Sequence, residues 1–255
     1  MRYLKGHGTE NDFVLLPDLD DALELTPDLV ARICDRRAGL GADGVLRVVR
    51  HDDPAEAAYF MDYRNADGSV AEMCGNGVRV YARYLVDAGL AAPGVMALAT
   101  RGGVKQVEVF ADRVVVDMGP AVVGEPVLVD GEKATGVDMG NPHAVLPVPS
   151  VVALGVLAPD RRDVNVEYVE QVGPRHLRMR VHERGVGETR SCGTGACAVV
   201  VSEVLRTASG RGEPYRVDVP GGTLVVTWRP DGHVLLDGPA VLVAEGELRD
   251  DWLWP

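Results

Sequence analysis

The stretch NADGSVAEMCGNGVRVYARYLVDAG, residues 65–89, joins a glycine-rich turn to a helical pattern. A second stretch, ERGVGETRSCGTGACAVVVSEVLRTAS, residues 183–209, repeats this order. The turn CGNG begins at Cys74 and the turn CGTG begins 118 residues later, at Cys192. In both stretches, a cysteine stands immediately before a predicted helix.

Two further pairs of residues share nearly this spacing. Pro120 and Pro239 lie 119 residues apart, as do Gly68 and Gly187. A repeat of this length is too long for a solenoid unit, and it predicts two similar α/β halves that face each other across a cleft. Coincidence is the competing interpretation for the turns alone, because the chain has 30 glycines, but three aligned spacings favour a repeat.

The patterns around these turns predict an α+β fold, in which each half is a mixed, mainly antiparallel sheet or barrel around a central helix. Thr26 and Pro27 predict the start of one helix, and apolar spacing predicts others at residues 78–89 and 196–209. Gly89 and Gly210 stand at the ends of these two patterns, where glycine is common. Strands are predicted at residues 2–7, 12–17, 45–50, 57–64, 104–110, 113–119, 165–170, 176–183, 223–228 and 233–238.

The expected boundary between the halves lies near Gly119. Residues 1–118 then form the N-terminal half, with Cys74, and residues 119–243 form the C-terminal half, with Cys192. The tail, about residues 244–255, is expected to pack back on the N-terminal half.

Composition indicates a folded, water-soluble protein. Hydrophobic residues make up 46% and charged residues 25%, as in ordinary globular proteins. The net charge of −12 and the lack of a basic stripe argue against nucleic acid. No signal peptide or membrane-spanning run stands out in the sequence, so we expect no membrane association and a cytoplasmic location.

The four cysteines are expected to be reduced thiols, because a cytoplasmic chain of this length is not a disulfide scaffold. The default interpretation of a thiol is a small buried residue, and it holds for Cys34. Cys74 and Cys192 differ because each would lie at the positive end of a helix dipole. Such a position lowers the pKa of a thiol toward neutrality, where it can both accept and donate a proton.

Two thiols on opposite sides of a cleft suit the inversion of a carbon centre. Removing the α-proton of an amino acid leaves a nearly planar carbanion, so inversion requires a second group that delivers a proton to the opposite face. The helix starts could also hold the α-carboxylate as charge develops. The chain has only three lysines, Lys5, Lys105 and Lys133, and none has a recognisable Schiff-base setting. We therefore expect no cofactor and no metal.

Other motifs give weaker signals. GLGADG, residues 39–44, matches the dinucleotide fingerprint, but it follows a helix and enters a strand, the reverse of the required context. Cys192 and Cys197 are a weak pair for a metal site. His143 taken alone is best interpreted as a turn histidine, and Glu183 with Arg184 as a surface ion pair. Their nearness to the second glycine turn favours a functional interpretation, because an arginine with several amides can hold a distal carboxylate.

Nearly the whole chain resembles the diaminopimelate epimerase family, which interconverts LL- and meso-diaminopimelate on the bacterial route to lysine and peptidoglycan. The resemblance rests on the segments HGTENDFV (7–14), GADG (41–44), NADGSVAEMCGNG (65–77), MGNPHAV (139–145), NVEYV (165–169), ERGVGETRSCGTGACA (183–198) and PGG (220–222). The two cysteine segments are long and specific.

The resemblance implies a fold of the diaminopimelate epimerase type and a role for each matching residue. Cys74 and Cys192 are then the acid/base pair, and His143 and Glu183 tune the two thiols. The residues implied to contact the reacting carboxylate are Gly75, Asn76, Gly193 and Thr194, and Asn11 is implied to belong to the same substrate pocket. Those implied to recognise the distal amino and carboxylate groups are Asn65, Asn141, Asn165, Glu183 and Arg184.

Some positions depart from the family pattern. A glutamine often follows the aspartate of GADG, whereas Gly44 stands here. The opening is HGTEN in place of HGLGN, and NPHAV replaces NPHCV. The resemblance also implies a homodimer, but Ala244 replaces the tail tyrosine associated with dimer contacts.

Three other functions remain open. A proline or hydroxyproline racemase of the same superfamily would have similar turns, but Arg184 and the three asparagines argue against it because such a substrate lacks a charged distal end. A thiol redox or metal-binding protein has little support from the cysteine spacing. A binding protein without catalysis is disfavoured, because both thiols and the distal residues are present.

Overall fold

The chain folds as two units, each with strands around one long helix. Residues 1–253 are described by the computed structural model. Contacts between Cα atoms assign Met1–Val116 and the segment from Pro239 onward to unit 1, and Asp117–Gly238 to unit 2. The sequence-based boundaries stood at residues 118/119 and 243/244. The chain therefore leaves unit 1 within the strand Val114–Pro120 and returns just after the strand His233–Gly238.

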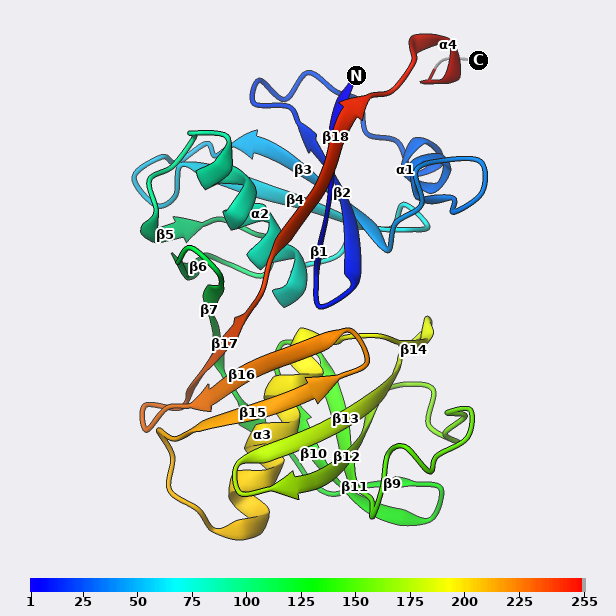
Figure 1. The fold of residues 1–255 in the computed structure, drawn as a ribbon, viewed down its shortest axis with the longest axis vertical. Helices are drawn as coiled ribbons and strands as arrows, with labels where there is room; N and C mark the ends of the chain where they lie inside the picture. The colour runs from blue at the N-terminus through cyan, green and yellow to red at the C-terminus, as the bar shows by residue number, and fades with distance from the viewer. Residues whose placement is uncertain (254–255) are drawn as a thin grey trace. The chain divides into compact units, whose positions relative to one another are not determined.

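Unit 1 contains a sheet with the strand order β18-β1-β2-β3-β4. The β2–β3 pair is parallel and the other pairs are antiparallel. The helix α2 packs against β1, β2 and β18 (Figure 1). The strands of this sheet are β1 (Arg2–Gly8), β2 (Asn11–Pro17), β3 (Gly44–Arg50), β4 (Tyr59–Asn65) and β18 (Val241–Glu247). The other elements of unit 1 are α1 (Pro27–Cys34), α2 (Gly75–Asp87), β5 (Gly94–Leu98), β6 (Lys105–Val109), the first part of β7 (Val114–Pro120) and α4 (Asp250–Leu253).

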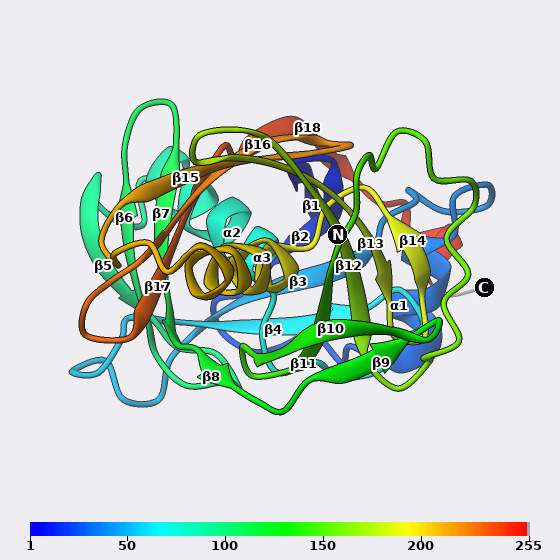
Figure 2. The same cartoon turned by 90° about the horizontal axis from the view of Figure 1, so that it is seen from below.

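Unit 2 contains a mixed sheet with the order β17-β16-β15-β13-β12-β11-β10-β8. In addition, β14 pairs with β13, and β9 pairs with β10. The pairs β11–β12 and β13–β15 are parallel. Figure 2 shows α3 nearly end on, with the strands of this unit around it. The elements are β8 (Val122–Val123), β9 (Val127–Val129), β10 (Glu132–Asp138), β11 (Pro142–Pro147), β12 (Asn165–Gly173), β13 (His176–Glu183), β14 (Gly187–Thr189), α3 (Gly193–Thr207), β15 (Pro214–Val219), β16 (Gly222–Trp228) and β17 (His233–Gly238).

The composition of α3 explains its central place. Residues 195–201 of this helix are all buried, including three consecutive valines, Val199–Val201. A helix that is apolar on all sides has no face to present to water and is stable only when surrounded. The predicted α+β class is therefore confirmed, with open mixed sheets rather than closed barrels.

Local sequence signals place several helix ends, but Gly210 does not end α3, because the left-handed residue there is Ala208, with a φ of +50°. The Thr26 hydroxyl accepts a hydrogen bond from Leu29 N at 3.3 Å, and Pro27 is the first residue of α1. Gly89 follows α2 with a φ of +69°, which glycine adopts without a Cβ clash. The predicted strands at β6–β7 and at β12–β13 pair as antiparallel hairpins. Strands β5, β8–β11, β14, β15 and β18 were not predicted.

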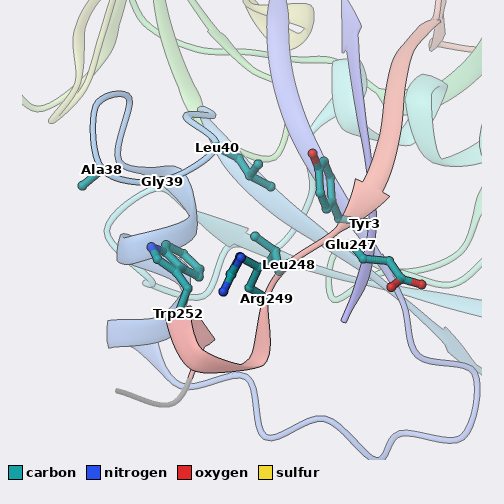
Figure 3. Close-up of a pocket in the computed structure, with 8 residues that line it drawn as sticks. All are labelled: Tyr3, Ala38, Gly39, Leu40, Glu247, Leu248, Arg249 and Trp252. Carbon is teal, nitrogen blue, oxygen red and sulfur yellow. The ribbon is translucent and has the colours of Figure 1, made fainter.

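The segment after β18 packs on unit 1. The Arg32 guanidinium lies 4.8 Å from the centre of the Trp252 ring, a cation–π contact. Beside it is a pocket of about 230 Å³, lined by Tyr3, Ala38, Gly39, Leu40, Glu247, Leu248, Arg249 and Trp252 (Figure 3). This pocket contains none of the residues predicted to act in catalysis.

Among residues 1–253, no helix is both long and apolar enough to cross a membrane.

Candidate active site

Cys74 is the N-cap residue of α2. Its extended backbone turns into the helix at Gly75, and its Sγ accepts a hydrogen bond from Gly77 N at 3.4 Å. The sulfur thus lies beside the N–H groups of the first helical turn, where the helix dipole favours negative charge. The glycine turn CGNG is itself this first turn.

Asn11 and Asn76 lie next to Cys74 in unit 1. Asn11 Oδ1 receives hydrogen bonds from Asn76 Nδ2 at 3.2 Å and from Cys74 Sγ at 3.6 Å. The other end of the Asn11 amide donates to Asp43 Oδ2 at 2.8 Å. Asp43 belongs to the segment GADG, so this segment holds Asn11 in its orientation. The structure therefore brings three of the predicted site residues together.

Asn65 lies at the end of β4 and is held by other partners. Its Oδ1 accepts a hydrogen bond from the Tyr63 hydroxyl at 2.9 Å, and its Nδ2 donates to Ser69 Oγ at 3.0 Å. These bonds fix the amide next to the loop that leads to Cys74. A second N–H of Asn65 stays available for a ligand, because an amide nitrogen has two donors.

Cys192 repeats the geometry of Cys74 in unit 2. It is the N-cap residue of α3, and its Sγ accepts a hydrogen bond from Gly195 N at 3.4 Å. The sulfur also lies 3.4 Å from the Thr194 hydroxyl. The Cys192 residue is only 6% exposed. The predicted helix starts are thus confirmed in both units, and each sulfur caps its own helix.

The environment of Cys192 opposes its ionisation. Burial raises the pKa of the Cys192 thiol well above its ordinary value, and the charges of Glu183 and Glu167 raise it further. The Thr194 hydroxyl and the Gly195 N–H lower it, but by less. The prediction that the helix start brings this pKa toward neutrality is therefore wrong for Cys192, because lost hydration outweighs the two hydrogen bonds.

His143 lies in a buried polar group of unit 2. Its Nδ1 is 2.6 Å from Glu167 Oε1, and its Nε2 is 3.0 Å from the side-chain amide of Asn141. His143 comes from β11 and Glu167 from the adjacent β12. The histidine is thus held on both sides of its ring rather than in an exposed turn.

The predicted distal residues of unit 2 form a connected set. Asn165 donates to the Pro142 carbonyl at 3.1 Å and accepts from Arg184 N at 2.9 Å, so it joins the His143 strand to the turn after β13. Glu183 Oε1 accepts from the Thr189 hydroxyl. The Arg184 residue is exposed, which leaves its guanidinium accessible to an anionic group.

Two charged residues of these networks were missed by sequence reasoning. Glu167 belongs to the segment NVEYV, and a carboxylate in a predicted buried strand is unusual enough to mark it as a candidate. Arg79 lies in the predicted helix, and its Nη2 donates to Asn76 Oδ1 at 2.8 Å. Its position next to the CGNG turn was the available signal.

Replacing Gly195 by alanine is expected to destabilise unit 2 by about 1–3 kcal/mol, the usual cost of overpacking. A Cβ at this position would lie 2.7 Å from Glu167 Oε1, and the carboxylate is held by His143. Without that contact, alanine would stabilise a helix by about 1 kcal/mol relative to glycine. Urea unfolding measures the difference.

Gly210→Ala is the matched control, because a Cβ at Gly210 meets no atom within 4 Å. Its effect should stay within about 0.5 kcal/mol. A Gly195→Ala protein as stable as the wild type would show that the carboxylate does not press on the helix.

Comparison with known proteins identifies the family. The family model described as diaminopimelate epimerase matches residues 3–124 and 135–243. A diaminopimelate epimerase of Streptomyces coelicolor is 55% identical, over 98% of this chain and 96% of that protein. One from Thermobifida fusca is 49% identical, over 98% of each chain.

Solved structures with low sequence identity share the fold. A phenazine biosynthesis protein of Bacillus anthracis aligns with a TM-score of 0.78 and 14% identity, over 98% of this chain and 99% of that one. A hydroxyproline epimerase of Agrobacterium vitis aligns with a TM-score of 0.72 and 14% identity, over 100% and 97%. Fold alone thus does not separate these enzymes, but the family model and the identity of 49–55% do. The chain belongs to the diaminopimelate epimerase family.

Proposed function

We propose that this protein interconverts LL- and meso-diaminopimelate without a cofactor, with Cys74 and Cys192 as its two acid/base groups. The observation that carries the two-thiol scheme is the repeated N-cap geometry, in which each sulfur lies 3.4 Å from an N–H of the first turn of its helix. Two equivalent thiols, one in each unit, supply the two protonation sites that inversion requires.

In this scheme the thiolate of one cysteine takes the α-proton, and the electron pair of the broken C–H bond remains on the substrate as a carbanion. The thiol of the other cysteine then gives its proton to the opposite face. Atoms and charge balance, because one thiolate becomes a thiol and one thiol becomes a thiolate. The N–H groups of Gly75, Asn76, Gly193 and Thr194 are proposed to bind the α-carboxylate, where they stabilise the developing charge.

The distal end of the substrate is proposed to bind Asn65, Asn141, Asn165, Glu183 and Arg184. Arg184 offers a planar group that can hold a carboxylate with two hydrogen bonds. Glu183 offers a carboxylate to the distal ammonium. His143 and Glu183 are proposed to tune the two thiols. Proline lacks a distal charged group, so these residues would have no group of that substrate to bind.

Turnover of LL-diaminopimelate in deuterated water is the direct test. We expect the first meso product to carry deuterium at the inverted carbon, because the proton that is given differs from the one that is taken. The recovered LL substrate should contain less deuterium than the product at the same time. Mass spectrometry and chiral separation measure both. The same assay with proline is the alternative: turnover of proline but not of diaminopimelate would overturn the assignment.

Activity in the presence of reductant and a chelator should match activity without the chelator. A metal-binding function predicts a loss under these conditions, so the comparison separates the two functions.

A further inference from the structure

Glu167 is a buried carboxylate that the two-thiol scheme does not use. Its side chain is 0% exposed, and its Oε1 lies 2.6 Å from His143 Nδ1. Its Oε2 is buried and has no hydrogen-bond partner among residues 1–253. Burying a polar group without a partner costs on the order of 1–3 kcal/mol. This cost needs a structural or functional explanation.

The strand register places Glu167 beside the other polar residues of unit 2. In the parallel pair β11–β12, His143 is opposite Asn165 and Val145 is opposite Glu167. Residues two apart on a strand point to the same face, so His143, Asn165 and Glu167 share one face of the sheet. Both strands pack against α3. The carboxylate therefore comes from the sheet toward the helix that Cys192 caps.

The two cysteine turns differ in what lies beside them. Gly195 is the third residue after Cys192, and a Cβ there would lie 2.7 Å from Glu167 Oε1. Gly77 is the third residue after Cys74, and a Cβ there would lie 3.2 Å from Leu46 Cδ2 and 3.6 Å from Phe13 Cζ. One turn is thus in contact with a carboxylate, whereas its counterpart is in contact with apolar side chains.

A carboxylate only accepts hydrogen bonds, so the short contact requires the proton on His143 Nδ1. In the neutral ring, Nε2 is then an acceptor. In the structure Asn141 Oδ1 faces Nε2, and a half-turn of this amide presents its NH₂ group to Nε2, as the neutral tautomer requires. A neutral ring leaves the negative charge of Glu167 uncompensated.

We propose that Glu167 is a positioning residue: it fixes the Nδ1–H tautomer of His143, and from the sheet side of α3 it keeps Cys192 protonated. In the ligand-free enzyme Cys192 is then the thiol and Cys74 the thiolate. Each turnover exchanges these two forms, and the reverse reaction begins from the exchanged form. The order of the two thiols rests on the proposed function, whereas the tautomer does not.

Several groups around Cys192 act in the same direction. Burial and the charge of Glu183, from β13, raise the pKa of this thiol, and the charge of Glu167, from β12, adds to them. His143, from β11, is the titratable group bonded to Glu167. The order proposed for the thiols thus comes from the sheet of unit 2 and not from the helix, since both helices begin in the same way.

The test is Glu167→Gln, which keeps the shape and removes the charge, compared with Glu170→Gln on the same strand. Glu170 accepts a hydrogen bond from Val151 N at 3.0 Å and is not among the charges that act on Cys192. The thiolate absorbance of Cys192 is measured against pH as the difference from a Cys192→Ser protein. We expect the midpoint to fall by on the order of one pH unit in Glu167→Gln, and to stay unchanged in Glu170→Gln.

Nitrogen NMR of histidine-labelled, ligand-free protein reads the tautomer directly. The His143 signal is assigned by its loss in His143→Gln. We expect Nδ1 protonated and Nε2 unprotonated in the wild type, and a mixture of tautomers in Glu167→Gln. An imidazolium signal in the wild type would overturn the proposal, because a cation beside Glu167 cancels its charge. An unshifted Cys192 midpoint in Glu167→Gln would overturn it as well.

The kinetic readout is a decrease of kcat by about tenfold or more in Glu167→Gln, with KM changed little, because proton transfer and not binding is affected. Glu167→Asp keeps the charge but shortens the reach to His143. We expect it to retain the high midpoint of Cys192 while losing the single tautomer. If Cys192→Ser itself remains fully active, the two-thiol scheme fails, and the NMR result still decides the role of Glu167 toward His143.

Discussion

Replacing either Cys74 or Cys192 by alanine is expected to lower the rate of epimerisation by at least about 100-fold, and up to about 10,000-fold, the usual contribution of one general acid or base. Each variant retains one proton-transfer group, which can return a proton only to the face from which it was taken. The measurement is the appearance of the meso isomer from LL-diaminopimelate. Full activity in either variant would exclude the two-thiol scheme.

The N-cap role of the two cysteines has to be separated from their chemistry. Alanine removes the acceptor of the Gly77 or Gly195 N–H and is expected to cost up to about 1 kcal/mol of stability. Serine is a preferred N-cap residue, and its hydroxyl is a far weaker acid than a thiol. Cys74→Ser and Cys192→Ser should therefore be as stable as the wild type and still be inactive.

Cys34→Ala and Cys197→Ala are the matched controls. Cys34 is buried in unit 1, and burial raises the pKa of its thiol to about 12. Cys197 lies within α3, five residues after Cys192, and is 0% exposed. Both variants are expected to lose stability through packing and to keep their epimerase activity.

The elements that the sequence predicts are those in which local signals and burial agree. Thr26 and Pro27 predict the start of α1, and the apolar run 196–201 predicts a buried helix. Strands β10 and β11 were missed because glycine and proline interrupt the segment 132–147. Their pairing depends on partners distant in sequence, such as β12, which a local pattern does not contain.

The two cysteines of the candidate site could be predicted because the same pattern, a cysteine and a glycine turn before a helix, occurs twice in the chain. Glu167 and Arg79 could not be predicted, since each is a single charged residue within an apolar pattern. The helical spacing of α2 marks Val78, Tyr81 and Leu85 as buried and would leave Arg79 to solvent. Arg79 is buried because a polar network surrounds the first turn of α2. Periodicity in the sequence predicts which face of a helix is buried, but it does not predict the hydrogen-bond partners of a single side chain.

Replacing Arg79 by methionine is expected to destabilise unit 1 by about 2–6 kcal/mol, because two acceptors each lose a donor at a cost of about 1–3 kcal/mol. Arg79 is 0% exposed. It donates to the Pro239 carbonyl at 3.2 Å, to the Gly75 carbonyl at 3.3 Å and to Asn76 Oδ1 at 2.8 Å. Methionine fills much of the space but leaves Asn76 Oδ1 and the Pro239 carbonyl without this donor, whereas the Gly75 carbonyl keeps its helical hydrogen bond. Urea unfolding, with hydrogen exchange of the α2 amides, measures the loss in unit 1.

Arg83→Met, one turn later in α2, is the matched control. Arg83 is only partly buried, and its Nη2 donates to the Phe110 carbonyl at 2.6 Å, so we expect a loss of about 1 kcal/mol or less. The network also predicts a difference in activity, because Arg79 orients Asn76, which bonds the same Asn11 oxygen as Cys74. Arg79→Lys should recover part of the stability but little activity, since an ammonium lacks the planar set of donors that reaches three acceptors. Equal losses in Arg79→Met and Arg83→Met would mean that the polar network does not hold the start of α2, and that Cys74 depends on the helix alone for its place.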